Sequence, residues 1–437
     1  MRLALVLLCL LPLAAHAEPL TLLEAYDRSL HNDPAFQGAS FDYQASQEEP
    51  AIGRAGLLPR LSAGARSGDT QQLRGRDTDT GQESERYGTT TLSLSARQPL
   101  LDASAYAGYQ QSKARGQLGS AAFQDASQEL FNRVIEAYFE AARQSNELKL
   151  AEQQRAAIEG LTLQTRRLYE AGDGTITDLD EAQARLDLIK AQQIEYQARL
   201  QAALRTLAGR TGTPVETIQA MHDELPPQAP LSAERDLQYW QHQARLQAPR
   251  LDASRAAVSV AETELSRERA GHYPSLAMVG EYSDNDQENL REDFQRQSSY
   301  YLGLSLDVPL YAGGGVSASV RRSQHALSSA NARLDNELQT LLDDIERDYL
   351  GVTSGYLKCR ALQTAVRSNQ RALESAQKGY QAGVRSTVDI LNAQQVLFAA
   401  RRDLLNTKLL MLQSYVSLYS RTGQMHRGIL EEVQALF

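Results

Sequence analysis

The sequence is poor in cysteine, in basic residues and in long apolar segments, and each shortage excludes a class of protein. Only two of the 437 residues are cysteine, which excludes a scaffold held together by disulfides. After residue 17 there is no run of about 18 apolar residues, which excludes a bundle of transmembrane helices. The 45 basic residues are outnumbered by 54 acidic ones, and the net charge of -9 argues against a nucleic-acid partner.

The residue patterns of common catalytic and metal sites are also missing. The sequence contains no HExxH zinc motif, no Walker A phosphate loop and no GxSxG nucleophile motif. Histidines are scattered singly and lack the spacing of metal ligands. We therefore expect a protein that is not an enzyme and that uses no cofactor and no metal.

Residues 1–17 have the form of a signal peptide. Arg2 precedes an apolar run, and Ala15 and Ala17 give the small-x-small pattern that signal peptidase cleaves. Cys9 lies within this segment and follows Leu8, where a lipid-anchoring site requires a small residue, so we expect no lipid anchor. The chain is thus predicted to be exported, with Cys359 as the one cysteine left after cleavage.

The remaining chain contains an internal duplication. Residues 169–183 reappear as residues 380–394, and six of the fifteen positions are identical. This repeat predicts two structural units, 18–212 and 231–423, joined by a linker at 213–230 and followed by a tail at 424–437. The linker holds four of the thirteen prolines, as a connecting segment would.

Proline placement divides each unit into helical and extended parts. No proline occurs at 100–213 or at 310–437, and both stretches are rich in helix-forming residues with apolar pairs at helical spacing. We predict helical hairpins at about 103–210 and 313–421. Gly172 and Gly383 would end the first arm of each, with Thr175 or Ser386 capping the second.

Before each hairpin the apolar period changes from helical to alternating. This pattern predicts strands at about 60–68, 88–98, 275–283 and 300–309, separated within each pair by a polar loop. Apolar residues alternating with polar ones are typical of a lipid-facing barrel with a wet interior. Four strands cannot close a barrel, and open edges cannot face hydrocarbon, so several copies must share one. Two copies would give a filled barrel, whereas three would leave a bore.

The duplicated order of two strands and a long hairpin, with Tyr-x-Ala-Gly-x-x-(Ser/Thr)-x-x-Asp at both turns, resembles TolC-type outer-membrane channel proteins. The resemblance implies a mixed α and β membrane protein: a homotrimer that shares a twelve-stranded outer-membrane barrel, continued into the periplasm by an α-helical tunnel. It also implies a periplasmic adaptor, an inner-membrane ABC transporter or other pump, and contact with outer-membrane lipid.

Within that family, the Gly-Arg-Ala-Gly-Leu-Leu-Pro run at 53–59 resembles components that secrete alkaline protease or lipase. The implied function is the exit duct of a type I secretion system. A drug-efflux channel is the alternative, because a polar bore suits both kinds of cargo, and a periplasmic coiled-coil protein without a channel is a remote one.

The resemblance also assigns roles to residues at the hairpin turns. A periplasmic gate is implied in which Thr177 and Asp178 of one hairpin bond Tyr380 and Arg385 of the other. A constriction just inside the gate would be lined by Asp389 and by Asn392, where the family has a second aspartate. Gly172 and Gly383 are implied to lie at adaptor-docking tips. The residues themselves leave a plainer reading open, in which Asp178 and Asp389 cap helices and the glycines only end them.

Overall fold

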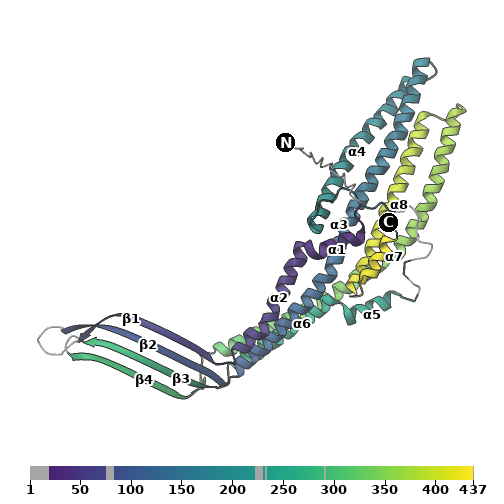
Figure 1. The fold of residues 1–437 in the computed structure, drawn as a ribbon. Coiled ribbons are helices and arrows are strands. Elements are labelled where there is room, and N and C mark those ends of the chain that lie inside the picture. The colour runs from purple at the N-terminus through teal and green to yellow at the C-terminus, as the bar shows by residue number, and fades with distance from the viewer. Residues whose placement is uncertain (1–18, 75–82, 222–229, 232–233, 290–291, 437) are drawn as a thin grey trace, which may run out of the picture. The chain divides into compact units, whose positions relative to one another are not determined.

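A computed structural model describes the chain except for residues 1–18, 75–82, 222–229, 232–233, 290–291 and 437 (Figure 1). The expected signal peptide and part of the expected linker therefore lie outside the described residues. The chain divides into two compact units. One comprises residues 1–39, 125–249 and 339–437, and the other comprises residues 40–124 and 250–338. Each unit draws on both halves of the duplication.

The second unit contains a single antiparallel sheet. Its strands are β1 (Arg60–Arg74), β2 (Glu83–Leu101), β3 (Ser275–Asn289) and β4 (Glu292–Asp307), paired in the order β1-β2-β3-β4 (Figure 1). All four strands are longer than the sequence predicted and continue into the segments expected to be loops. Hydroxyl pairs bridge β1 and β2 where the predicted strand 60–68 ends and just beyond it, Ser67 with Thr90 at 3.1 Å and Thr70 with Thr89 at 3.0 Å. Cross-strand pairs of this kind stabilise a ladder without apolar side chains.

The two faces of the sheet differ in polarity. On one face Leu94 lies opposite Tyr282, which in turn lies opposite Tyr300. Apolar residues of β4 extend this face, and Leu302, Leu304 and Leu306 are all exposed. On the other face Ser62 and Ser95 share a hydrogen bond of 2.6 Å between β1 and β2. The sheet therefore has one apolar and one polar face, as the alternation predicted.

Helices pack closely in the second unit because small residues line their contacts. The helices α2 (Pro34–Ala55) and α3 (Ala103–Ala171) are in contact. A Cβ at Gly119 of α3 would clash with Ser46 of α2, and one at Gly116 would touch Pro50. The helix α6 (Pro249–Ala270) bonds to α3 through Glu264, which accepts a hydrogen bond from Gln111. Burial opposes the charge of Glu264, but Gln111 and Arg267 outweigh it and lower the pKa of this carboxyl.

The first unit consists of helices. It contains α1 (Leu22–Asn32), α4 (Ile176–Thr211), α5 (Leu237–Gln247), α8 (Thr387–Arg421), α9 (Arg427–Gln434), and parts of α3 and α7 (Gly315–Gln381). An apolar cluster joins the two hairpins, with Ile158, Leu186, Leu373 and Ile390 among its buried members. None of the described helices carries an apolar stretch long enough to cross a bilayer.

Three helices of this unit, α1, α5 and α9, lie outside the predicted hairpins. The segment predicted as a tail contains α9, whose Ile429, Leu430 and Val433 are buried. These three residues follow helical spacing, which a search for alternating apolar residues does not detect.

Candidate functional site

The turn of each hairpin has the same backbone hydrogen bonds. At the end of α3 the Gly172 amide donates to the Tyr169 carbonyl at 3.0 Å, and the Asp173 amide donates to Leu168 at 2.9 Å. At the end of α7 the Gly383 amide donates to Tyr380 at 2.9 Å, and the next amide donates to Gly379. Both glycines have positive φ, 85° and 74°. This is the Schellman arrangement, which satisfies the last carbonyls of a helix.

Glycine is required at both turns because of the backbone conformation, and not because neighbouring atoms would clash with a side chain. A Cβ built on Gly172 or on Gly383 would meet no atom within 4 Å. Only the left-handed φ therefore selects glycine here. Open space around the two turns is compatible with the implied adaptor docking, which stays a prediction.

The helices that follow the turns begin with side-chain caps. Thr175 accepts from the Asp178 amide at 3.2 Å and donates its hydroxyl to the Asp178 carboxylate at 2.6 Å. Ser386 and Asp389 form a complete capping box, with the Asp389 carboxylate accepting from the Ser386 amide at 2.9 Å. These contacts match the plainer reading of both aspartates: the Asp389 carboxylate caps an amide at the start of α8, and the Asp178 carboxylate accepts the hydroxyl of the Thr175 cap at the start of α4.

The capping box also fixes the charge of Asp389. Hydrogen bonds from the Ser386 amide and hydroxyl, and the nearby Arg385 guanidinium, hold the pKa of Asp389 below its usual value. Arg385 Nη1 lies 3.4 Å from the Asp389 carboxylate. At neutral pH Asp389 is thus an ionised carboxylate close to the hairpin turn.

The structure places all four implied gate residues near the turns but does not join them. Thr177 is exposed at the start of α4, and Tyr380 is half-buried against the apolar cluster at the end of α7. Within the described residues of this single chain, no hydrogen bond connects Thr177 or Asp178 to Tyr380 or Arg385. Arg385 instead contacts Asp389 on its own side of the turn. The gate stays a prediction.

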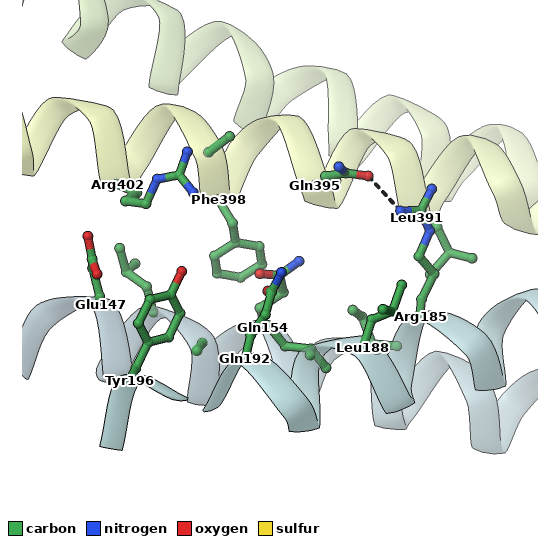
Figure 2. Close-up of a pocket in the computed structure, with 15 residues that line it drawn as sticks. Glu147, Gln154, Arg185, Leu188, Gln192, Tyr196, Leu391, Gln395, Phe398 and Arg402 are labelled. Carbon is green, nitrogen blue, oxygen red and sulfur yellow. Dashed lines mark hydrogen bonds between the residues drawn. The ribbon is translucent and has the colours of Figure 1, made fainter. Parts of the chain in front are cut away.

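A different residue connects the two hairpins. Arg185 of α4 donates from Nη1 to Gln395 Oε1 at 2.9 Å (Figure 2). It also donates from Nη2 to Asn392 Oδ1 at 3.4 Å, and both acceptors lie on α8. Asn392, expected only at the constriction, is therefore also a hydrogen-bond acceptor for the other hairpin. Sequence reasoning missed Arg185 because it belongs to no motif, and the duplication places Val396 at the matching position.

A cavity of about 220 Å³ lies beside this connection, between α3 and α4 on one side and α8 on the other. Figure 2 shows Leu188, Gln192, Leu391 and Phe398 around it, with Arg185 at one end. Arg402 and Tyr196 lie at the other end. Burial opposes the charge of Arg402, but hydrogen bonds to Asp403 and Tyr196 outweigh it and raise the pKa of Arg402. Polar side chains therefore border the cavity between the two hairpins.

Both halves of the duplication match one known protein family. The model of the outer membrane efflux protein family matches residues 25–213 and again residues 240–424. This chain belongs to that family. The double match covers both halves, and it confirms the resemblance that the turn motif indicated.

Individual relatives extend over almost the whole chain. The proteases secretion protein PrtF of Dickeya chrysanthemi is 34% identical, over 96% of this chain and 92% of its own length. The alkaline protease secretion protein AprF of Pseudomonas aeruginosa is 32% identical, over 98% and 89%. The outer membrane protein TolC of Vibrio cholerae is 25% identical, over 95% and 93%.

Solved structures agree on the fold. The Campylobacter jejuni CmeC outer membrane channel superimposes with a TM-score of 0.79 at 16% identity, covering 95% of this chain and 89% of that chain. At this identity the likeness concerns the fold alone. Together with the family match, it confirms the predicted TolC-type fold and the predicted outer-membrane location.

Proposed function

We propose that this protein is the outer-membrane exit duct of a type I secretion system, through which an exported protein leaves the cell. The observation that carries the proposal is the full-length similarity to two protease-secretion proteins, PrtF and AprF, each above 30% identity. The expected partners are an inner-membrane ABC transporter and a periplasmic adaptor. As a passive duct, the protein would need no catalytic group, because the transporter supplies the energy.

The sheet supports assembly into a homotrimer. β1 and β4 are the edges of the four-stranded sheet, and each has one side that no strand among the described residues pairs with. Unpaired backbone groups cannot face lipid, so other copies must cover both edges. Three copies would close a twelve-stranded barrel with the polar face inward and the leucine-rich face toward outer-membrane lipid.

The proposed gate lies at the turns of the two hairpins. Thr177 and Asp178 would bond Tyr380 and Arg385 in the closed trimer, with Gly172 and Gly383 at the tips that an adaptor contacts. Arg385 is exposed, and among the described residues its guanidinium makes one ion pair, a long one to Asp389, so it could exchange this partner for a carboxylate of another hairpin. Three ionised Asp389 side chains near the axis would attract cations and repel anions.

Drug efflux is the second candidate, favoured by the family description and by the fold shared with CmeC. The two functions separate in complementation. A Dickeya chrysanthemi strain without PrtF, supplied with this chain, is expected to regain extracellular protease. A TolC-deficient strain is expected to stay sensitive to toxic small molecules. The reverse pattern would assign the chain to efflux, and failure of both would refute a role as an export duct.

The gate is tested by single-channel recording of the purified full-length protein in planar bilayers. Wild-type protein is expected to give a small, cation-preferring conductance. Tyr380→Phe combined with Arg385→Ser should raise it several-fold. Arg199→Ser is the matched control, because Arg199 pairs with Glu195 on its own helix. Equal conductance in all three proteins would refute the gate assignment.

A further inference from the structure

Arg185 forms its contacts well inside the hairpin tip. It lies ten residues beyond the Thr175 cap, which at 1.5 Å per residue is about 15 Å along α4. Its acceptors, Asn392 and Gln395, are three residues apart on α8 and so share one helix face. One guanidinium therefore bonds, through two separate nitrogens, to two residues of the other hairpin that lie about one helical turn apart.

The charge of Arg185 is not balanced by these partners. Both acceptors are neutral amide oxygens, and among the described residues no carboxylate lies within ion-pair distance of its guanidinium. The two nearest cations along α4 differ in this respect. Lys190 pairs with Asp187 at 3.3 Å, and Arg199 pairs with Glu195, each on the same helix. Arg185 thus combines a half-buried, unneutralised charge with bonds that cross between the hairpins.

Packing beside this contact is incomplete. A cavity of about 220 Å³ lies between side chains of α4 and α8, so the two helices pack only in part there, although Leu186 and Ile390 belong to one apolar cluster. Side chains that line such a space lose dispersion contacts on that side. The stability of the contact between α4 and α8 near the tip therefore depends more on the Arg185 hydrogen bonds than it would if side chains filled the cavity.

From these observations we infer that Arg185 is a positioning residue for opening: a second tie, set back from the tip, that holds α4 against α8 and must release before the hairpins separate. The inference rests on the proposed duct function. It differs from the gate at the turns in residues, in depth and in chemistry. Its acceptors are amides that do not titrate, so the tie persists at pH values where a carboxylate partner would be protonated.

The tie is tested by a double-mutant cycle in planar bilayers with purified full-length protein. Arg185→Ala and Gln395→Ala should each raise the open probability, by about threefold to tenfold for a partly exposed contact repeated in each copy. The double variant should do little more than Arg185→Ala, because both changes remove the same bond. Arg199→Ala, an arginine of the same helix with an on-helix partner, should leave the open probability unchanged.

Failure of the tie and failure of the duct give different results. If Arg185→Ala matches wild type while the Tyr380→Phe and Arg385→Ser variant conducts strongly, the tie is refuted and the duct stands. The tie is refuted equally if Arg199→Ala opens the channel as much as Arg185→Ala. If no variant conducts and none restores protease export, the duct itself is refuted.

Asn392 supplies a test in which the sign of the effect decides. Asn392→Asp would give Arg185 a carboxylate partner, and charge-assisted bonds are about twice as strong as neutral ones. The open probability should fall, and it should not fall when Arg185 is already alanine. If Asn392 only lines the constriction, the change would increase cation selectivity to the same extent in both backgrounds and leave opening unaltered, which would contradict the tie.

Discussion

Arg421 is the residue whose loss should most weaken the first unit. It is the last residue of α8, and its guanidinium bridges two carboxylates of α7, with Nη1 2.6 Å from Asp344 and Nε 2.8 Å from Asp348. The side chains of Asp344 and Asp348 are only 11% and 13% exposed. Arg347 gives Asp344 a second partner at 3.0 Å, whereas the hydrogen bond to Asp348 comes from Arg421. Arg421→Met would therefore leave the Asp348 carboxylate buried without that hydrogen bond.

The size of the effect should depend on pH. Burial already raises the pKa of Asp348 to about 6, in spite of the opposing attraction of Arg421. Since this is above the value of an unfolded aspartate, about 3.9, the folded state favours the protonated form, and that stability is lost as pH rises through about 6. Without Arg421 the pKa rises further. Arg421→Met should thus cost little near pH 5 and about 2–4 kcal/mol near pH 8, as for a broken buried ion pair.

The assay is thermal unfolding of the detergent-solubilised protein, followed by far-ultraviolet circular dichroism at about pH 5 and about pH 8. Arg427→Met is the control, because Arg427 also binds a carboxylate with two nitrogens, both 2.9 Å from Asp27, but in an exposed pair worth at most about 1 kcal/mol. Asp348→Asn should restore most of the stability of Arg421→Met near pH 8. An equal loss at both pH values, or no rescue, would refute the reasoning from a stranded carboxylate.

Four further predictions concern single residues. Ser386→Ala should destabilise the start of α8 by about 1 kcal/mol, measured by the same unfolding assay, since it removes a capping hydroxyl; an unchanged midpoint would contradict this. Because the pKa of Asp389 is lowered in the fold, its stabilising contribution is present above the unfolded value and is lost as pH falls, so Asp389→Asn and wild type should converge in acid. Cys359 is buried, and burial raises the pKa of its thiol to about 11, so a maleimide should label it only after unfolding, and rapid labelling of folded protein would contradict the packing. Trp240, the one tryptophan of the sequence, is fully buried against Tyr419, so its fluorescence should resist a water-soluble quencher until the first unit unfolds.

The sequence was most informative where backbone rules restrict the residue type. Gly172 and Gly383 stand at left-handed positions, and Thr175 and Ser386 cap the helices that follow them, so the turns could be placed from four residues. The starts of two strands could also be predicted from the sequence, because β1 and β3 begin at Arg60 and Ser275, directly after a proline.

The ends of the strands and the contacts between the hairpins were harder to predict from the sequence, for two different reasons. Beyond residue 68 the alternation of apolar residues stops, while the ladder continues through serine and threonine pairs such as Thr70 with Thr89. Arg185 could not be singled out because a helical arginine is as common on a solvated surface as at a contact. Its role depends on which face of α8 lies opposite, and that is a property of the tertiary structure.

The contacts of α9 have a consequence for the order of events during biogenesis. Gln434 accepts a hydrogen bond from the Leu23 amide at 2.9 Å, and Arg427 donates two hydrogen bonds to the Asp27 carboxylate. The helix α9 therefore binds α1, although about 400 residues separate them in the sequence. Contacts between such distant segments form late, because a very long loop must close first. During synthesis of the chain, α1 is complete about 400 residues before its partner α9. The first unit therefore cannot finish folding until the last residues of the chain have been made.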